Sequence, residues 1–397
     1  MSRPEREVLV AGVGMIPFTK PGQGASYDEM GNAAARAALA DAGMAFDIVQ
    51  QAYVGYVYGE SCSGQRALYK AGMSGIPIFN VNNNCSTGSS ALFLARQAVE
   101  SGMAEVALAL GFEQMQPGAL PTIYTDRTSP FEDFDAACDE LCDTDLPLAL
   151  RYFGGAGREH MQKYGTTLSD FAKVRAKASR HAAHNPLSVF RNVMSEEEIL
   201  AAPMLWPGVM TRPMACPPTC GAAAAILVSR DFARRNGLDP KVRIAAQVMT
   251  TDTPITFSSR SMIHLVGGEM TRRAAIQVYE AASVGPEDIR VVELHDCFAH
   301  NEIISYEGLG LCGEGEAAKF IADGDNSYGG RVVTNPSGGL LSKGHPLGAT
   351  GLAQCFELTS QLRGSAAGRQ VGNVRHALQH KLGLGGACVV TLYEAVT

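Results

Sequence analysis

The chain has 397 residues, of which 46% are hydrophobic and 18% are charged, and its formal net charge is −7. This is the balance of a globular protein of about two or three domains, and its acidic character is not that of a nucleic-acid-binding protein, which usually has a basic domain. The longest apolar run, residues 222–228, is too short to cross a membrane, and the charged N-terminus lacks the apolar core of a signal peptide, so we expect a cytoplasmic protein without membrane insertion.

Strand patterns alternate with helical periodicity in the first part of the chain. Apolar runs at residues 8–14, 51–58 and 105–110 predict strands. Apolar residues at helical spacing predict helices at residues 29–42 and 86–101. Alternating strands and helices are typical of a parallel sheet covered on both faces, so we predict an α/β fold.

The character of the sequence changes at about Gln114. From there to about Pro213 the chain is rich in prolines and polar loops, which indicates an inserted segment. Sheet-like sequence then returns, and the strands and the helix that we predict there lie at residues 222–229, 242–249, 271–282 (the helix), 289–294 and 387–393. We therefore predict three units, which are an N-terminal half of residues 1–113 plus 214–240, an inserted loop domain of residues 114–213, and a C-terminal half of residues 241–397.

Two segments of the chain resemble each other. Cys85-Ser-Thr-Gly88 opens one predicted helix, and His345-Pro-Leu-Gly348 opens another around residues 351–362. In each segment a reactive side chain stands at a helix start with a glycine three residues later, and the helix leads towards a strand. Two similar halves built in this way would bring Cys85 and His345 face to face.

Cys85 follows three asparagines in the sequence NNNCSTGSSA. A free cysteine has a pKa near about 8.5, and a helix N-terminus stabilises its anion by only about 0.3–1 kcal/mol, which is less than about one pKa unit. A base must complete the deprotonation, and beside a histidine the pKa of a thiol can fall to about 4. We therefore expect a Cys85 thiolate that one of the nine histidines activates.

Two of these histidines stand out. His345 lies in the tight, glycine-containing turn SKGHP, and His295 ends a predicted strand in the sequence HDCF. Alternate residues of an extended chain face the same side, so we expect His295 and Cys297 to face one site and Asp296 to turn away. The carboxyl end of a sheet is where α/β folds bind ligands.

Structural interpretations compete with this one. A lone buried cysteine is more often a packing residue, and a lone histidine in a turn is usually a hydrogen-bonded polar group. One cysteine and two histidines at element ends together favour catalysis.

We expect the ten cysteines to be mostly reduced. The pairs Cys138/Cys142 and Cys216/Cys220 would bind zinc only if four ligands converged, so we interpret them as small buried hydrophobic residues and predict no metal site.

Three motifs carry a resemblance to a known family. They are VNNNCSTGSSAL at residues 81–92, HDCFAHNE at residues 295–302 and NPSGGLLSKGHPLGATG at residues 335–351. On these motifs the chain resembles the thiolase superfamily, and most closely the sterol carrier protein type of 3-ketoacyl-CoA thiolase. The resemblance implies a five-layered α-β-α-β-α fold of two similar halves with an inserted loop domain. The chain ends where the thiolase region ends, so we expect no fused lipid-transfer domain.

The same resemblance implies roles for individual residues. Cys85 is the expected acyl-accepting nucleophile and His345 its activator. Two negative oxygens form at different places in the reaction, so two oxyanion holes are needed. His295 is expected to help form one oxyanion hole, and the backbone of Cys85 and Gly383 is also expected to stabilise an oxyanion. Cys297 is the expected acid/base at the α-carbon of the substrate.

One motif departs from that of ordinary thiolases. They carry a Cys-x-Gly motif near the C-terminus whose cysteine is the acid/base, and here the sequence is His380-Lys381-Leu382. In the sterol carrier protein type the HDCF cysteine takes over that role, as Cys297 permits. Close relatives of this type tend to have asparagine in place of Lys381, so the second oxyanion hole is where this sequence differs.

The implied activity is thiolytic cleavage of 3-ketoacyl-CoA, including branched or sterol side chains, to acetyl- or propionyl-CoA and a shortened acyl-CoA. CoA is then a co-substrate, and no permanently bound cofactor is expected. The alternatives are a thiolase-fold aldolase acting on 3-hydroxyacyl-CoA side chains and a non-catalytic acyl-CoA or lipid-binding protein. We also expect a homodimer or tetramer, with the edge strand at residues 79–83 paired across a two-fold axis.

Two weaker patterns complete the predictions. Lys173, Lys177, Arg180 and His184 fall at helical steps on one face, which would attract the phosphates of CoA; a solvated helix face is the competing interpretation. Residues 308–313 fit GxGxxG but follow a predicted helix, so we interpret these glycines as helix-ending residues rather than a dinucleotide site.

Overall fold

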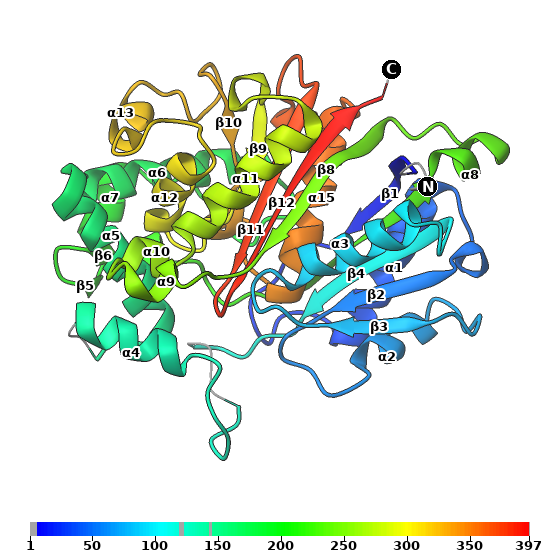
Figure 1. The fold of residues 1–397 in the computed structure, drawn as a ribbon, viewed down its shortest axis with the longest axis horizontal. Coiled ribbons are helices and arrows are strands. Elements are labelled where there is room, and N and C mark those ends of the chain that lie inside the picture. The colour runs from blue at the N-terminus through cyan, green and yellow to red at the C-terminus, as the bar shows by residue number, and fades with distance from the viewer. Residues whose placement is uncertain (1–5, 119–122, 143–144, 397) are drawn as a thin grey trace.

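The computed structural model describes residues 6–118, 123–142 and 145–396. Ten of its described strands form one mixed sheet in the order β10-β9-β11-β12-β8-β1-β7-β4-β2-β3. The middle of this sheet is joined through a single pair of residues, Leu9 in β1 and Arg243 in β8. The sheet therefore consists of two half-sheets that meet at one edge (Figure 1).

The two half-sheets repeat the same topology. The N-terminal half-sheet contains β3 (Ile78–Val81), β2 (Gln51–Gly55), β4 (Val106–Glu113), β7 (Gly221–Ser229) and β1 (Val8–Met15). The C-terminal half-sheet contains, in the equivalent order, β10 (Val333–Thr334), β9 (Val291–Glu293), β11 (His376–Gly383), β12 (Ala387–Ala395) and β8 (Val242–Thr250). In each half the first two neighbouring pairs are parallel and the next two are antiparallel. The internal repeat is thus confirmed, but the expectation of a parallel sheet is wrong, because β7 and β12 return antiparallel to β4 and β11.

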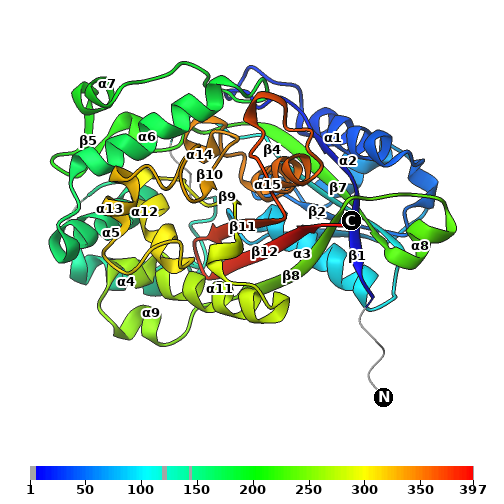
Figure 2. The same cartoon turned by 90° about the horizontal axis from the view of Figure 1, so that it is seen from above.

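Helices lie on both sides of each half-sheet. In β4, Leu108 and Leu110 pack in the cluster that contains residues of α1 (Tyr27–Ala42) and α2 (Ser63–Tyr69). The alternate residues Ala107 and Ala109 face the opposite way, into the cluster of α3 (Thr87–Glu100) and α15 (Leu347–Leu362). Helix α15 contacts β7 and also β11 of the other half (Figure 2).

The outer side of the C-terminal half-sheet is covered by α11 (Gly268–Ala282), which packs on β8 and β12, and by α12 (Ala299–Gly308), which packs on α11. The layers therefore run from α1 and α2 through the first half-sheet, the central pair α3 and α15, and the second half-sheet to α11 and α12. The expected five-layered α-β-α-β-α fold is confirmed.

The long connection between β4 and β7 belongs in sequence to the first half. Its described helices and strands are α4 (Glu132–Leu141), α5 (Leu148–Tyr164), α6 (Leu168–Ala183), α7 (Glu196–Ala201), β5 (Met204–Trp206) and β6 (Met210–Thr211). Both α5 and α6 pack against α12, so this connection covers the second half of the molecule (green, Figure 1). We propose residues 114–213 as an inserted domain.

The remaining described helices are short. They are α8 (Arg230–Arg235), α9 (Ile255–Ser258), α10 (Met262–Leu265), α13 (Ala317–Ala322) and α14 (Gly339–Ser342). No described helix is long and apolar enough to span a membrane.

Most predicted elements appear within a few residues of their expected bounds, with two informative differences. The predicted strand 51–58 ends at Gly55, because the backbone N–H groups of Val57 and Tyr58 turn to the carboxylate of Glu113. Strand β11 was not predicted at all, because its sequence, HALQHKLG, has polar residues at positions that are buried. The interpretation of the glycines at 308–313 as helix-ending is confirmed, since α12 ends at Gly308 and Gly310 has a φ of 69°.

Candidate active site

The three asparagines before Cys85 build the turn that presents it. Asn84 adopts a left-handed conformation with φ 50°, and its backbone N–H donates to Asn82 Oδ1 at 3.1 Å. The Asn83 N–H donates to Thr87 Oγ1 at 2.8 Å, in the first turn of α3. The Asn84 side chain donates to the carbonyl of Leu384, after β11, at 3.2 Å. The amides thus fix Cys85 between the start of α3 and the C-terminal half.

The turn before α15 fixes the protonation pattern of His345. Its Nδ1 lies 2.8 Å from Thr350 Oγ1, and the single hydroxyl proton of Thr350 is donated to the carbonyl of Pro346 at 2.8 Å. Thr350 must therefore accept from His345, so Nδ1 carries the ring proton. Nε2 is buried without a hydrogen-bond partner among the described residues, and its lone pair is available to a proton.

Glycines bring the starts of the two central helices into contact. A Cβ on Gly88 of α3 would lie 2.5 Å from the Gly348 carbonyl oxygen of α15, and one on Gly351 would lie 2.3 Å from the Ser89 nitrogen. Only hydrogen fits at these places. The close approach joins the two repeated segments and sets their reactive residues opposite each other.

Cys85 Sγ and one ring nitrogen each of His295 and His345 lie within 4.8 Å of one another. The two imidazole rings are nearly perpendicular, at 81°, with centroids 5.4 Å apart. All three side chains are buried. The predicted approach of Cys85 and His345 is confirmed, and His295 joins them. The group has three potential ligand atoms, one fewer than a closed structural zinc site.

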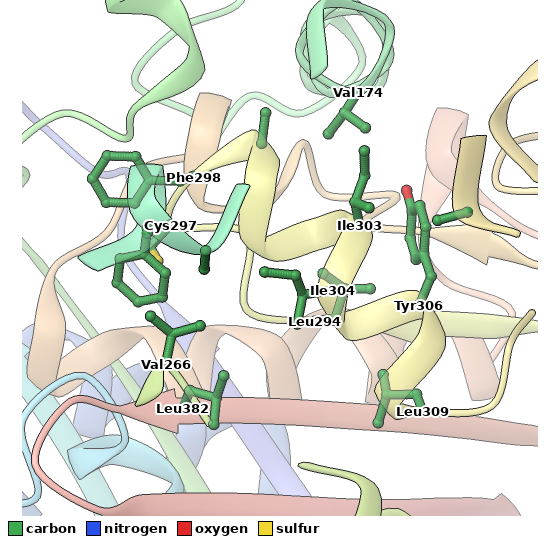
Figure 3. Close-up of a cluster of buried hydrophobic side chains, with 14 of the residues drawn as sticks. Val174, Val266, Leu294, Cys297, Phe298, Ile303, Ile304, Tyr306, Leu309 and Leu382 are labelled. Atoms are coloured by element: carbon green, nitrogen blue, oxygen red, sulfur yellow. The ribbon is translucent and has the colours of Figure 1, made fainter. Parts of the chain in front are cut away.

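The HDCF segment directs its side chains to opposite sides. Asp296 turns away from the cysteine and accepts the N–H of Leu340 at 2.7 Å, at the start of α14. This confirms its predicted orientation. Cys297 is buried at the apolar cluster that contains Phe298, Val266 and Leu382 (Figure 3).

Burial controls the ionisation of these groups. It raises the pKa of Cys85 to about 11, against an opposing effect of Lys381 and with a smaller contribution from Glu113. Burial, together with the charge of Lys381, holds the pKa values of His295 and His345 well below the usual range. The resting site therefore holds a neutral thiol beside a neutral imidazole, whereas the sequence led us to expect a thiolate.

The thiol of Cys297 is also protonated at rest. Burial and then the neighbouring thiols of Cys216 and Cys85 hold its pKa well above the usual range. The Cys297 carbonyl accepts the Cys216 N–H at 2.9 Å, which anchors it to the connection between β4 and β7. A protonated, desolvated thiol has the properties of a proton donor.

Gly383 ends β11 directly against the cysteine turn. A Cβ there would lie 2.2 Å from the Asn83 carbonyl oxygen and 3.0 Å from the Ser86 nitrogen. The structure therefore places Gly383 beside Cys85, and its oxyanion role stays a prediction.

The predicted basic stripe does not form. Lys177 is buried, and its Nζ contacts Glu302, Tyr306 and Thr334, because the packing of α6 on α12 covers this face. Lys173 pairs with Asp170 at 3.4 Å, and Arg180 is exposed. The expectation that Lys177 faces the phosphates of CoA is wrong, and the interpretation of the pattern as one solvated face is wrong for the same reason.

The CxxxC pairs do not join a potential metal site among the described residues, where the only group of three or more candidate ligands is that of Cys85, His295 and His345. Cys138, Cys142 and Cys220 are buried, and Cys216 is partly buried.

Glu113 was not expected in the site, and the burial of Lys381 was not expected. Glu113 ends β4, and its carboxylate accepts the N–H groups of Val57 at 3.1 Å, Tyr58 at 2.9 Å and Gly348 at 2.9 Å. It therefore joins the first half to the start of α15, and burial raises its pKa to about 7. Lys381 is fully buried in β11. Glu113 is a charged residue that follows an apolar run, whereas Lys381 follows two polar residues in HALQHKLG, so its burial had no local signal.

Comparison with known proteins agrees with this architecture. The thiolase N-terminal domain matches residues 8–195, and the thiolase C-terminal domain-like family matches residues 256–393. The chain is 51% identical over 392 residues to sterol carrier protein 2 of Rattus norvegicus, covering 98% of this chain and 72% of that protein. The chain belongs to the thiolase family.

Other members of similar length match along nearly the whole chain. Non-specific lipid-transfer protein-like 2 of Caenorhabditis elegans is 43% identical, covering 99% of this chain and 97% of that protein. Benzoylsuccinyl-CoA thiolase subunit BbsB of Thauera aromatica is 34% identical, covering 97% and 96%. Membership of the thiolase family supports an acyl-CoA acyltransferase activity for this chain.

Solved structures show the same thiolase fold. The Ltp2-ChsH2(DUF35) aldolase superposes with a TM-score of 0.83 at 24% identity, covering 98% of each chain. Human mitochondrial 3-ketoacyl-CoA thiolase in complex with CoA superposes with a TM-score of 0.74 at 19% identity, covering 99% of this chain and 98% of that one.

Proposed function

We propose that this thiolase-family chain cleaves 3-ketoacyl-CoA by thiolysis, through an acyl-enzyme on Cys85. The observation that carries the proposal is the buried group of Cys85, His295 and His345, in which His345 Nε2 has no hydrogen-bond partner among the described residues. Because thiol and imidazole are both neutral at rest, a proton can pass from Sγ to Nε2 as the sulfur attacks. We propose His345 as the base and His295 as a donor to the developing oxyanion, with the backbone of Cys85 and Gly383 beside it.

In the first step the sulfur of Cys85 bonds to the 3-keto carbon, and its proton moves to His345. The bond between the α- and β-carbons then breaks, and the enolate of acetyl- or propionyl-CoA leaves. The enolate carbon needs a proton, which we assign to Cys297, since its pKa is held well above the usual range by burial.

In the second step CoA takes the acyl group. The thiol of CoA gives its proton to the Cys297 thiolate and attacks the Cys85 thioester. Cys85 leaves and recovers its proton from His345, which restores the resting state. A thioester on cysteine is about as energetic as one on CoA, so this transfer is readily reversible, whereas a serine ester would be a trap.

The test is incubation of the purified chain with free CoA and 3-ketoacyl-CoAs that differ in chain length and branching. We expect shortened acyl-CoA as product and, without free CoA, a mass increase on Cys85 equal to the acyl group. A chain that cleaves 3-hydroxyacyl-CoA without any adduct on Cys85 is an aldolase, and one that binds acyl-CoA without turnover is a binding protein. Either result contradicts the proposal.

We also propose that the chain forms a dimer, or a tetramer of two dimers, through β3. This strand is at the edge of the ten-stranded sheet, and its Phe79 is 47% exposed. An uncovered edge with an exposed aromatic ring is suited to pairing with a second copy across a two-fold axis. Sedimentation should show a dimer or larger species, which Phe79→Lys should weaken; a fully active monomer contradicts the idea.

A further inference from the structure

Three lysines are buried, and they differ in whether their side-chain amine has a partner. Lys177 contacts the carboxylate of Glu302, and Lys343 Nζ lies 3.2 Å from Glu293. Lys381 is equally buried, yet its Nζ has no hydrogen-bond partner among the described residues. A buried ammonium normally requires a compensating charge, so the missing partner of Lys381 needs an explanation.

The position of Lys381 suggests one. It lies in β11 two residues before Gly383, and its carbonyl is 3.5 Å from Ser86 Oγ, beside the nucleophile. Eight titratable side chains around the site lie close enough to interact electrostatically with its amine. They are Cys85, Cys216, His295, Asp296, Cys297, Lys343, His345 and His380. The carboxylate among them, Asp296, is occupied by the N–H groups at the start of α14.

We propose that Lys381 is the cation that stabilises the anions formed in this site, first the thiolate of Cys85 and then the enolate of the departing acyl-CoA. The thiolate part stands on the burial of Lys381, its unpartnered Nζ and the packing of the end of β11 against the Cys85 turn, and the enolate part rests on the proposed thiolysis. Lys381 forms no covalent bond in either step. Its ammonium gains its counter-ion only when the thiol loses a proton to His345 or when the carbon–carbon bond breaks.

This role explains why the amine has no partner at rest. A carboxylate partner would neutralise the ammonium and leave the Cys85 thiolate without support. Burial lowers the pKa of Lys381 to about 7, and negative charge on Cys85, Cys297 or Asp296 opposes this effect. Near neutral pH the amine therefore exists in both its neutral and its charged form. It can be neutral while the site carries no anion and charged when the site carries one.

The pairing of this amine with a thiol predicts an unusual pH dependence. A neutral amine beside a thiol and an ammonium beside a thiolate contain the same number of protons, so their ratio does not change with pH. The thiolate fraction should therefore rise up to about pH 7, stay constant until the second proton leaves, and then rise again. Without Lys381 it should rise about tenfold per pH unit without this plateau.

The experiment measures the rate at which iodoacetamide modifies Cys85 between pH 6 and 10, by quantitative peptide mapping. A Cys62→Ser background removes the exposed cysteine, and Lys381→Met removes the charge at similar length. We expect the plateau in the background chain and its loss in Lys381→Met, with alkylation at least about tenfold slower at neutral pH, the effect of one pKa unit. Asp296 and the histidines are unchanged in both chains, so any inflection that they cause remains.

Each result has a separate meaning. Absence of a plateau in the background chain overturns the proposal even if Lys381→Met fails to fold, and so do identical profiles in the two chains. A plateau in a chain that cleaves no 3-ketoacyl-CoA supports the role of Lys381 and contradicts the proposed function. Thiolysis without a plateau supports the proposed function and contradicts the role of Lys381.

The enolate part has its own readout. In a chain that performs thiolysis, Lys381→Met should lower kcat by about 10²–10³-fold, the usual loss of one oxyanion-stabilising group, with little change in KM. Borohydride treatment with a 3-ketoacyl-CoA should leave Lys381 unmodified. A reduced adduct on Lys381 would mean that the amine attacks the ketone, which overturns the electrostatic role.

Discussion

Strands β4 and β11 occupy equivalent positions in the two half-sheets, yet they bury different chemistry. β4 has the sequence VALALGFE, and β11 has the sequence HALQHKLG. Gln379 is bound to Ser89 and Gly351, and His380 to Thr271, whereas Lys381 Nζ has no hydrogen-bond partner in the part of the chain that the structure describes. The repeat thus duplicates the scaffold but not the chemistry. In the proposed mechanism the first half presents the nucleophile on an apolar support, and the second half contributes the base, the second acid and the buried charge.

The largest effect should come from the first half. Cys85→Ala should abolish both the acyl-enzyme and thiolysis, because Cys85 contributes the sulfur that lies within 4.8 Å of a ring nitrogen of His345. The matched control is Cys355→Ala, since Cys355 is also buried with a pKa raised to about 11 but contacts Thr359 instead of a histidine. Intact mass after mixing with acyl-CoA should show the adduct in the control and not in Cys85→Ala. An adduct of equal yield in both would place the nucleophile elsewhere.

Substitutions in the second half should affect different steps of the reaction. Cys297→Ala should still accept an acyl group from a simple acyl-CoA, because that transfer expels a thiolate, but should not cleave 3-ketoacyl-CoA, whose leaving carbon needs a proton. His295→Ala should slow cleavage by about 10²–10³-fold, the loss of one oxyanion donor.

Intact mass and thiolysis rates of these two variants measure the difference. If Cys297→Ala cleaves at the parent rate, the acid is another group. His380 is the next candidate, although its ring nitrogens already lie 3.0 Å from Thr271 Oγ1 and 3.5 Å from the His295 backbone nitrogen.

The smallest effect should come from the residue that holds the base. Thr350→Val removes the acceptor of the His345 Nδ1 proton, so the ring can place its proton on Nε2 and lose its basic lone pair. We expect kcat to fall by about 10–100-fold with KM nearly unchanged. Thr359→Val, on the same helix and equally buried, is the control and should retain parent activity. Equal rates in the two variants would show that Thr350 does not set the tautomer.

Much of the fold was predictable from local sequence. The strand patterns, the helix at α1 and the two segments beginning at Cys85 and His345 gave the repeat, because apolar periodicity and glycine spacing are local properties. β11 could not be predicted in this way, since two of its polar residues, Gln379 and His380, form hydrogen bonds with partners far away in sequence, such as Thr271 for His380. The pairing of Lys177 with Glu302 was hidden for the same reason.

The sequence by itself predicted which residues the structure brings together: a cysteine after three turn-forming asparagines, and histidines at the ends of a strand and a loop. Only the tertiary structure decided their ionisation. Burial between the half-sheets raises the pKa of Cys85 to about 11 and holds the pKa of His345 well below the usual range, so both groups are neutral at rest. The same burial lowers the pKa of Lys381, and we propose that its charged form pairs with an anion only during the reaction. Sequence alone did not show this, because desolvation depends on what surrounds a residue in space and not on its neighbours along the chain.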